Sequence, residues 1–130
     1  QTRVRSLFAR DTKSWQVPFQ IQFASNSTTA TGWTAIDTTA VRVPNAWEGK
    51  ECHLIVRARV TGGTGRIRLN SAGTTGGPVD VTATSLTDAE IQTDLTAGLD
   101  TAFKVEVQAP AGQTIFVECD DQITAWVVDA

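Results

Sequence analysis

Apolar and polar residues alternate with a period of two along most of the chain. In residues 51–60 the apolar positions run from Cys52 to Val60 at every second residue, and most intervening positions are polar or charged. Such alternation is typical of a β-strand with one buried face. Glycine and Ser/Thr/Asn/Asp clusters between these segments indicate turns. The candidate strands are residues 4–9, 14–23, 33–36, 40–43, 51–60, 65–70, 79–83, 89–95, 103–108, 114–119 and 123–128.

The spacing of these strands predicts the fold class. Short strands separated by turn signals are typical of an antiparallel sandwich or barrel. We expect an all-β, antiparallel two-sheet β-sandwich, jelly-roll-like, with about 8–10 strands. The chain has 130 residues, the usual size of one domain. We therefore expect a single sandwich over residues 14–130, preceded by an extended arm or edge strand at residues 1–13.

Residues 85–95 fit two patterns. Thr87 followed by Glu90 forms a capping box, with Leu86 and Ile91 placed to act as a hydrophobic staple, which indicates a helix start. Ala89, Ile91 and further apolar positions also alternate strictly with polar ones, which indicates a half-buried strand. We favour the strand because the rest of the chain has strand periodicity.

A group of arginines is the most unusual feature of the sequence. They occupy alternate positions on two candidate strands joined by a glycine-rich link, residues 61–65. If these strands pair directly as a hairpin, the arginines share one outward face, because the alternate residues are apolar. Like charges opposite each other in a ladder are destabilising, so they need compensation. The arginines are Arg57, Arg59, Arg66 and Arg68.

Three sources of compensation remain open. Glu106 and Glu118 occupy outward positions on other candidate strands and could neutralise the arginines within the chain. A partner protein or an anionic ligand could do the same. Further candidate interface residues are outward-facing Phe116 and, in the N-terminal segment, Arg3, Arg5 and Phe8.

The sequence carries no recognisable catalytic or metal-binding motif. A GxSxG elbow, a P-loop and an HExxH helix are all missing. His53 and Cys52 are neighbours on one strand and point to opposite faces, so they cannot form a dyad. Asp120 and Asp121 lie where a hairpin turn is expected, and we interpret them as turn residues before calcium ligands or catalytic carboxylates. We therefore predict a protein that is not an enzyme and has no cofactor and no metal.

Charge and hydrophobicity narrow the range of partners. The formal net charge is −3, which argues against general nucleic-acid binding. No apolar run approaches the length of a membrane span. Cys52 and Cys119 both occupy inward positions, where they are either a disulfide between neighbouring strands or two buried thiols. Trp33 and Trp47 lie at strand edges, where they are either packing residues or platforms for sugar rings.

Two segments carry a resemblance to a known class of fold. They read GWTAIDTTAVRVPNAWEGKECHLIVRARVTGGTGRIRLNSAG and LTAGLDTAFKVEVQAPAGQTIFVEC. Together they resemble jelly-roll sandwiches of the carbohydrate-binding-module type, and small phage-encoded domains of the same shape. The resemblance spans residues 14–128 and rests on strand order. It implies either a decoration (cement) protein of a tailed-phage head or a module that binds glycans.

Between these functions we favour capsid decoration. The basic and apolar N-terminal segment and outward-facing Ile55 and Phe116 suit docking on a lattice. The expected partners are the major capsid protein and further copies of the chain, as a homodimer or homotrimer on the virion surface. The alternative is a secreted carbohydrate-binding module or tail-fibre domain that binds glycans through Trp33 and Trp47.

Overall fold

Residues 16–119 and 123–129 are described by the computed structural model of the chain. This part contains eleven strands and a short 3-10 turn, η2, at Asn45–Trp47. The strands are β1 (Gln16–Ile21), β2 (Asn26–Thr28), β3 (Thr34–Val43), β4 (Glu51–Val60), β5 (Gly65–Ser71), β6 (Thr74–Thr75), β7 (Val79–Val81), β8 (Thr87–Asp94), β9 (Gly98–Gln108), β10 (Ile115–Glu118) and β11 (Ile123–Val128).

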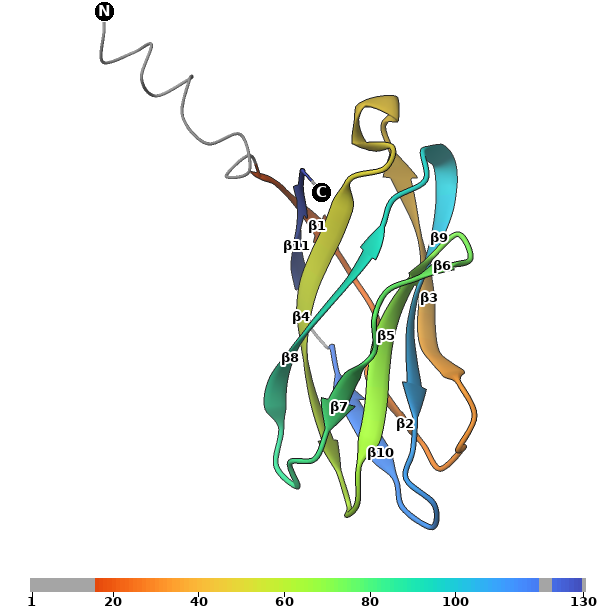
Figure 1. Cartoon of the computed structure of the whole chain (residues 1–130), viewed down its shortest axis with the longest axis vertical. Helices are drawn as coiled ribbons and strands as arrows, with labels where there is room; N and C mark the ends of the chain where they lie inside the picture. The colour runs from red at the N-terminus through yellow and green to blue at the C-terminus, as the bar shows by residue number, and fades with distance from the viewer. Residues whose placement is uncertain (1–15, 120–122, 130) are drawn as a thin grey trace, which may run out of the picture.

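The strands form two antiparallel sheets that face each other as layers (Figure 1). Sheet A has the order β1-β11-β4-β10-β2, with β8 also paired to β4. Sheet B has the order β3-β9-β5-β6, with β7 also paired to β5. The expected all-β, two-sheet antiparallel sandwich is therefore confirmed.

In sheet A, two of the rows of hydrogen-bonded backbone each consist of two short strands placed end to end. β8 pairs with β4 along Glu51 to Ala58, so both β10 and β11 pair with the opposite edge of β4. β10 pairs with β2, and β11 pairs with β1. The sheet is thus four rows wide: β8, then β4, then β10 and β11, then β2 and β1 at the opposite edge. β10 and β2 lie side by side at one end of the last two rows.

The core lies between the inward faces of the two sheets. Alternation along β4 buries its even-numbered residues, including Leu54, and alternation along β9 buries Phe103, Val105 and Val107. Burial of these apolar side chains between the sheets makes the main favourable contribution to the free energy of folding of a β-sandwich. The alternation of apolar and polar residues in the sequence therefore assigns the inward and outward faces of these strands correctly.

The expected hairpin between residues 51–60 and 65–70 is wrong. β4 belongs to sheet A and β5 to sheet B, so the link at residues 61–64 crosses from one layer to the other. Gly63 has a φ of +70°, which favours glycine. A Cβ on Gly65 would lie 3.0 Å from the backbone oxygen of Gln108 and from side-chain atoms of Val60 and Ile115. Glycine therefore allows the close approach of the two layers at this crossing.

Other strand predictions have mixed outcomes. The strand at 85–95 is confirmed as β8, and the bounds of β4 and β11 match the predicted ones. The two strands predicted at 33–36 and 40–43 form the single strand β3, with a bulge near Ile36. The short strands β2 and β6 lie in segments without alternation and were not predicted. The described residues contain eleven strands, one more than the upper end of the predicted range of about 8–10. The predicted arm at residues 1–13 lies outside the described residues.

Among the residues that the structure describes, no helix is long and apolar enough to cross a lipid bilayer.

Candidate functional site

The arginines singled out from the sequence lie on opposite sides of the molecule. Arg57 and Arg59 belong to β4 and point outward from sheet A, whereas Arg66 and Arg68 belong to β5 and point outward from sheet B. The inference that they share one face is wrong, because it depended on a hairpin that does not form. The chain therefore has two separate arginine pairs, one on each layer.

Three of these arginines have acidic neighbours within the chain. Arg57 is paired with Glu118 on the adjacent strand β10. On sheet B, Arg68 Nε lies 2.8 Å from Glu106 Oε1, and Arg66 Nε lies 3.8 Å from Asp80 Oδ1. Glu106 and Glu118 thus provide intramolecular compensation, one of the three sources that the sequence left open.

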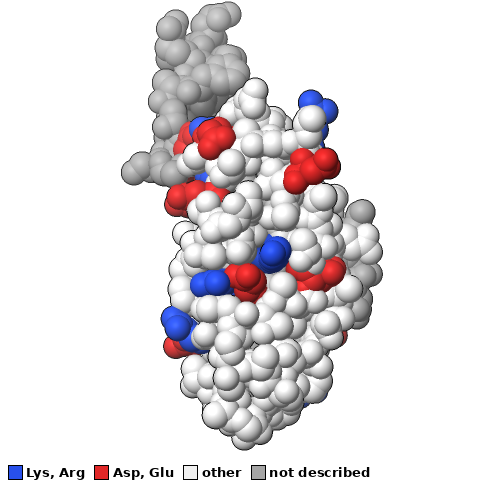
Figure 2. Space-filling view, turned by 90° about the vertical axis from the view of Figure 1, so that its right-hand side faces the viewer, with Lys and Arg blue, Asp and Glu red and all other residues white. Residues whose placement is uncertain are grey.

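Figure 2 shows the side on which β3 and β9 lie in Figure 1. Basic and acidic side chains lie beside one another across its middle, and its lower end shows neither kind. The loops at residues 29–33, 61–64 and 109–114 contain no charged residue. Arg66 and Arg68 each have an acidic side chain beside them, Asp80 and Glu106, so the arginines of sheet B do not form a basic patch.

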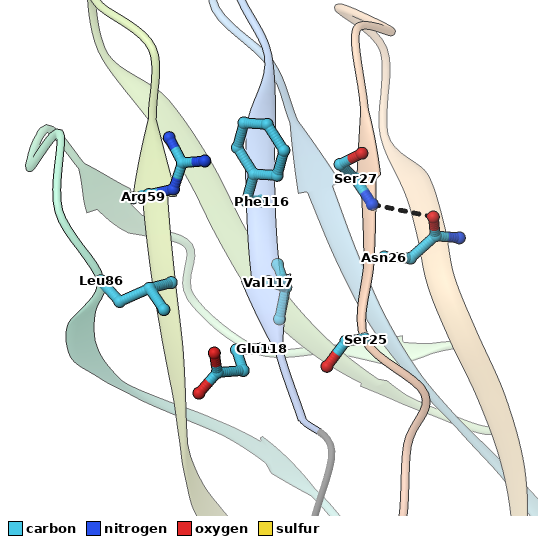
Figure 3. A pocket seen from close by; sticks show the side chains of 8 residues that line it. All are labelled: Ser25, Asn26, Ser27, Arg59, Leu86, Phe116, Val117 and Glu118. Atoms are coloured by element: carbon cyan, nitrogen blue, oxygen red, sulfur yellow. Dashed lines mark hydrogen bonds between the residues drawn. The ribbon is translucent and has the colours of Figure 1, made fainter.

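A groove of about 370 Å³ lies on the outer face of sheet A, over the ends of β4, β10 and β2. This volume is at the lower end of the range of small-molecule sites, about 300–1,000 Å³. Figure 3 shows Phe116 in the groove, with Arg59 on one side of it and Ser27 on the other. The lining residues are Ser25, Asn26 and Ser27 at β2, Arg59 on β4, Leu86 before β8, and Phe116, Val117 and Glu118 on β10.

The centre of the groove is a stack of Arg59 on Phe116. The two residues are direct cross-strand partners, and the guanidinium carbon of Arg59 lies 3.8 Å from the centroid of the Phe116 ring. Because both residues are on paired strands, the stack is held by rigid backbone. Both were candidate interface residues in the sequence, and the structure brings them together.

The polar rim of the groove comes from residues that the sequence did not single out. Ser25 Oγ accepts a hydrogen bond from the backbone N–H of Cys119 at 2.7 Å, so its own hydroxyl proton is available for another acceptor. Asn26 Oδ1 accepts from the backbone N–H of Ser27 at 2.8 Å. The only signal for this rim was the polar run Ser-Asn-Ser, one of the Ser/Thr/Asn/Asp clusters that indicate turns between the candidate strands.

The two tryptophans expected to stack on sugars lie far apart. Trp33 precedes β3 and Trp47 follows it in η2, so ten strand residues, about 33 Å, separate them. Arg68 lies over the Trp33 ring at 4.0 Å from its centroid. Trp47 packs on the core and meets Phe19 with ring centroids 5.4 Å apart. The two therefore do not form one platform.

The cysteines are buried, and the structure has no disulfide between them. The register places Val117 opposite Ala58 and Glu118 opposite Arg57. Cys119 therefore lies level with a β4 position that is four residues away from Cys52. Four strand residues correspond to about 13 Å, beyond the reach of a disulfide. Burial raises the pKa of the Cys52 thiol to about 12, so this group is protonated at neutral pH.

His53 lies on the outer face of sheet A, opposite in direction to Cys52 as expected. Its Nε2 lies 3.1 Å from Glu51 Oε1 and its Nδ1 lies 3.2 Å from Glu90 Oε2. Its ring stacks on Trp126 with centroids 5.6 Å apart. Within residues 16–119 and 123–129, no group of three or more His, Cys, Asp or Glu side chains is placed to hold a metal ion. Arg3, Arg5, Phe8 and the Asp120-Asp121 pair lie outside the described residues.

Comparison with known proteins identifies relatives of the fold. No protein-family model and no curated protein matches the chain. The CBM36-1 domain of a multidomain xylanase from the hindgut metagenome of Trinervitermes trinervoides superposes with a TM-score of 0.52 at 12% identity, over 88% of this chain and 98% of that one. The fold is similar to that of carbohydrate-binding modules.

Two further structures agree with this similarity. Carbohydrate-binding module CBM36 in complex with calcium and xylotriose gives a TM-score of 0.51 at 15% identity, over 86% of this chain and 98% of that one. The C-terminal domain of EclA, a sugar-binding protein, gives 0.50 at 13% identity, over 85% and 79%. At these identities the similarity concerns the fold alone, so the function has to be argued from the site.

Proposed function

We propose that the chain is a non-catalytic carbohydrate-binding domain, and that the groove over β4, β10 and β2 is its glycan site. The observation that carries the proposal is the combination, in one groove, of a partly exposed aromatic ring with several polar side chains. Small-molecule sites commonly combine an apolar surface with a few polar groups that fix orientation.

The chemistry of the groove suits a sugar ring. A pyranose has an apolar face of C–H groups, which packs on aromatic or aliphatic surface, and a rim of hydroxyls, which donate and accept hydrogen bonds. Phe116 and Leu86 supply the apolar surface. Ser25, Ser27 and the carboxylate of Glu118 supply polar partners around the ring.

The single carboxylate among the described lining residues supports sugar binding in preference to glycoside hydrolysis. Glycoside hydrolases use a pair of carboxyl groups on either side of the scissile bond. Among the described lining residues, Glu118 is the one carboxylate, and it is engaged by Arg57. We therefore assign Glu118 to positioning and recognition.

The capsid-decoration hypothesis loses one of its candidate docking surfaces, because Arg57 and Arg68 lie on opposite layers and form no shared arginine face. Its other candidate surface, the N-terminal segment, lies outside the described residues. Glycan binding needs only the groove. Under this proposal the partner is a polysaccharide and the location is extracellular.

A polysaccharide panel with matched variants tests the proposal. Affinity electrophoresis in gels that contain neutral or acidic plant, bacterial and algal polysaccharides should show retardation by at least one glycan. Phe116→Ala should abolish the retardation, and Trp33→Ala, a half-buried aromatic on the other side of the molecule, should leave it intact. Circular dichroism melts establish that each variant is folded. No retardation by any glycan, or loss in Trp33→Ala with retention in Phe116→Ala, contradicts the proposal.

A further inference from the structure

Arg59 differs from the other arginines of the two strands. Arg57, Arg66 and Arg68 each have a carboxylate within 4 Å, whereas no carboxylate of the described residues lies within that distance of Arg59. Its side chain is nevertheless half-buried in the groove. A partly desolvated guanidinium is stabilised by an anion.

The charge of the groove is therefore uneven. Glu118 is neutralised by Arg57, so the positive charge of Arg59 is the one without a counter-charge beside it. From this we infer that the groove selects glycans that carry a carboxylate, that is, polysaccharides with uronic acid residues. The inference rests on the proposed function and specifies its ligand class.

The geometry of the stack supports a carboxylate as the ligand group. The guanidinium carbon of Arg59 lies over the Phe116 ring, 3.8 Å from its centroid, so the ring restricts where the guanidinium can lie. The N–H edge of a guanidinium matches a carboxylate with two parallel hydrogen bonds. The site is built on cross-strand partners, so little conformational freedom is lost when the anion binds.

The hydroxyl groups around the stack complete the recognition of a sugar acid. Ser25 and Ser27 lie on the β2 side of Phe116, opposite Arg59 (Figure 3). A uronic acid residue beside the stack of Arg59 and Phe116 can direct its carboxylate to Arg59 and its ring hydroxyls to these serines. A neutral sugar in the same place leaves Arg59 without a counter-charge.

Oligogalacturonides and their methyl esters form a matched pair of ligands, because esterification removes the negative charge of the carboxyl group and leaves the sugar backbone unchanged. A second pair is linear xylo-oligosaccharides with and without a glucuronic acid branch. Isothermal titration calorimetry should show at least about tenfold tighter binding to the acidic member of a pair than to the neutral one. High salt should reduce this preference.

Variants assign the preference to Arg59. Arg59→Gln should bind both members of the pair with equal affinity, and Arg59→Lys, which keeps the charge and loses the planar edge, should retain part of the preference. Arg66→Gln, on the opposite layer, is the matched control and should bind as the wild type does. Thermal melts of all three variants report folding.

The outcomes separate this inference from the proposed function. Equal affinity of the wild type for acidic and neutral glycans overturns the uronic acid inference and leaves glycan binding intact. An acidic preference that survives in Arg59→Gln also overturns it, as does binding to sulfated glycans alone. No binding to any glycan of the panel overturns both.

Discussion

Double-mutant cycles on the ion pairs test the placement of the arginines on two layers. The side chains of Arg68 and Glu106 are only 21% and 13% exposed, and their charged atoms lie 2.8 Å apart. Hydrogen bonds to charged groups contribute about 1.5–3 kcal/mol, so we expect a coupling energy of about 1–2 kcal/mol between alanine substitutions at these positions. Arg57 and Glu118 are 55% and 32% exposed, and their coupling should be about 0.2–1 kcal/mol.

A third cycle, between Arg57 and Arg68, provides the control. These residues point outward from opposite sheets, which pack about 10 Å apart in a sandwich. Their substitutions should be additive within about 0.5 kcal/mol. Urea unfolding followed by tryptophan fluorescence gives the free energies of unfolding without adding salt. If the double variant of Arg57 and Arg68 is less stable than additivity predicts by clearly more than about 0.5 kcal/mol, each single variant already relieves a shared repulsion; the two arginines then share a face and the two-layer placement is wrong.

Three further predictions concern the core and the crossing between layers. Gly65→Ala should lower the free energy of unfolding by about 1–3 kcal/mol because its Cβ would crowd both layers, whereas Gly32→Ala, with nothing within 4 Å, should change it by less than about 0.5 kcal/mol; equal effects contradict this packing. Cys52, whose thiol pKa is raised to about 12 by burial, should react with iodoacetamide at pH 8 only after unfolding, and fast alkylation of the native protein contradicts its burial. Ser71 Oγ is buried without a hydrogen-bond partner among the described residues, so Ser71→Ala should be neutral or stabilising by up to about 1 kcal/mol in urea melts, and a clear loss contradicts it.

Strand periodicity predicted much of the fold because burial on one face imposes a period of two. β4 and β11 have the predicted bounds, and Leu54 and Val56 face the core as parity requires. The same periodicity decided residues 87–94 in favour of a strand over a helix with a plausible capping box. Tertiary burial of Ile91 outweighed the local helix signals.

The partner of each strand could not be predicted in the same way. Parity shows whether a residue points inward or outward, but it does not show to which sheet the strand belongs. A glycine-rich link of a few residues serves a hairpin or a crossing between layers equally well. The prediction that Arg57 and Arg68 share a face was therefore wrong because it paired residues 51–60 with residues 65–70, whereas the prediction that both side chains point outward was correct.

The site depends on contacts that are distant in sequence. Arg59 and Phe116 were each identified as outward-facing candidates, but they meet only because β10 pairs with β4. Ser25 and Ser27 reach the groove through β2, a three-residue strand too short to show alternation. The sequence thus contained the central stack as two separate residues and its polar rim only as a short polar run between candidate strands.

Mapping of ligand contacts by two-dimensional NMR tests the glycan site most directly. In titrations of the 15N-labelled chain with an acidic oligosaccharide, we expect the largest changes of amide chemical shift at residues 25–27 and 116–118 and around Arg59 and Leu86. Residues around Trp33, Arg66 and Arg68 on the other layer should not respond. Changes centred on that layer, or none at saturating ligand, would contradict a glycan site in the groove of sheet A.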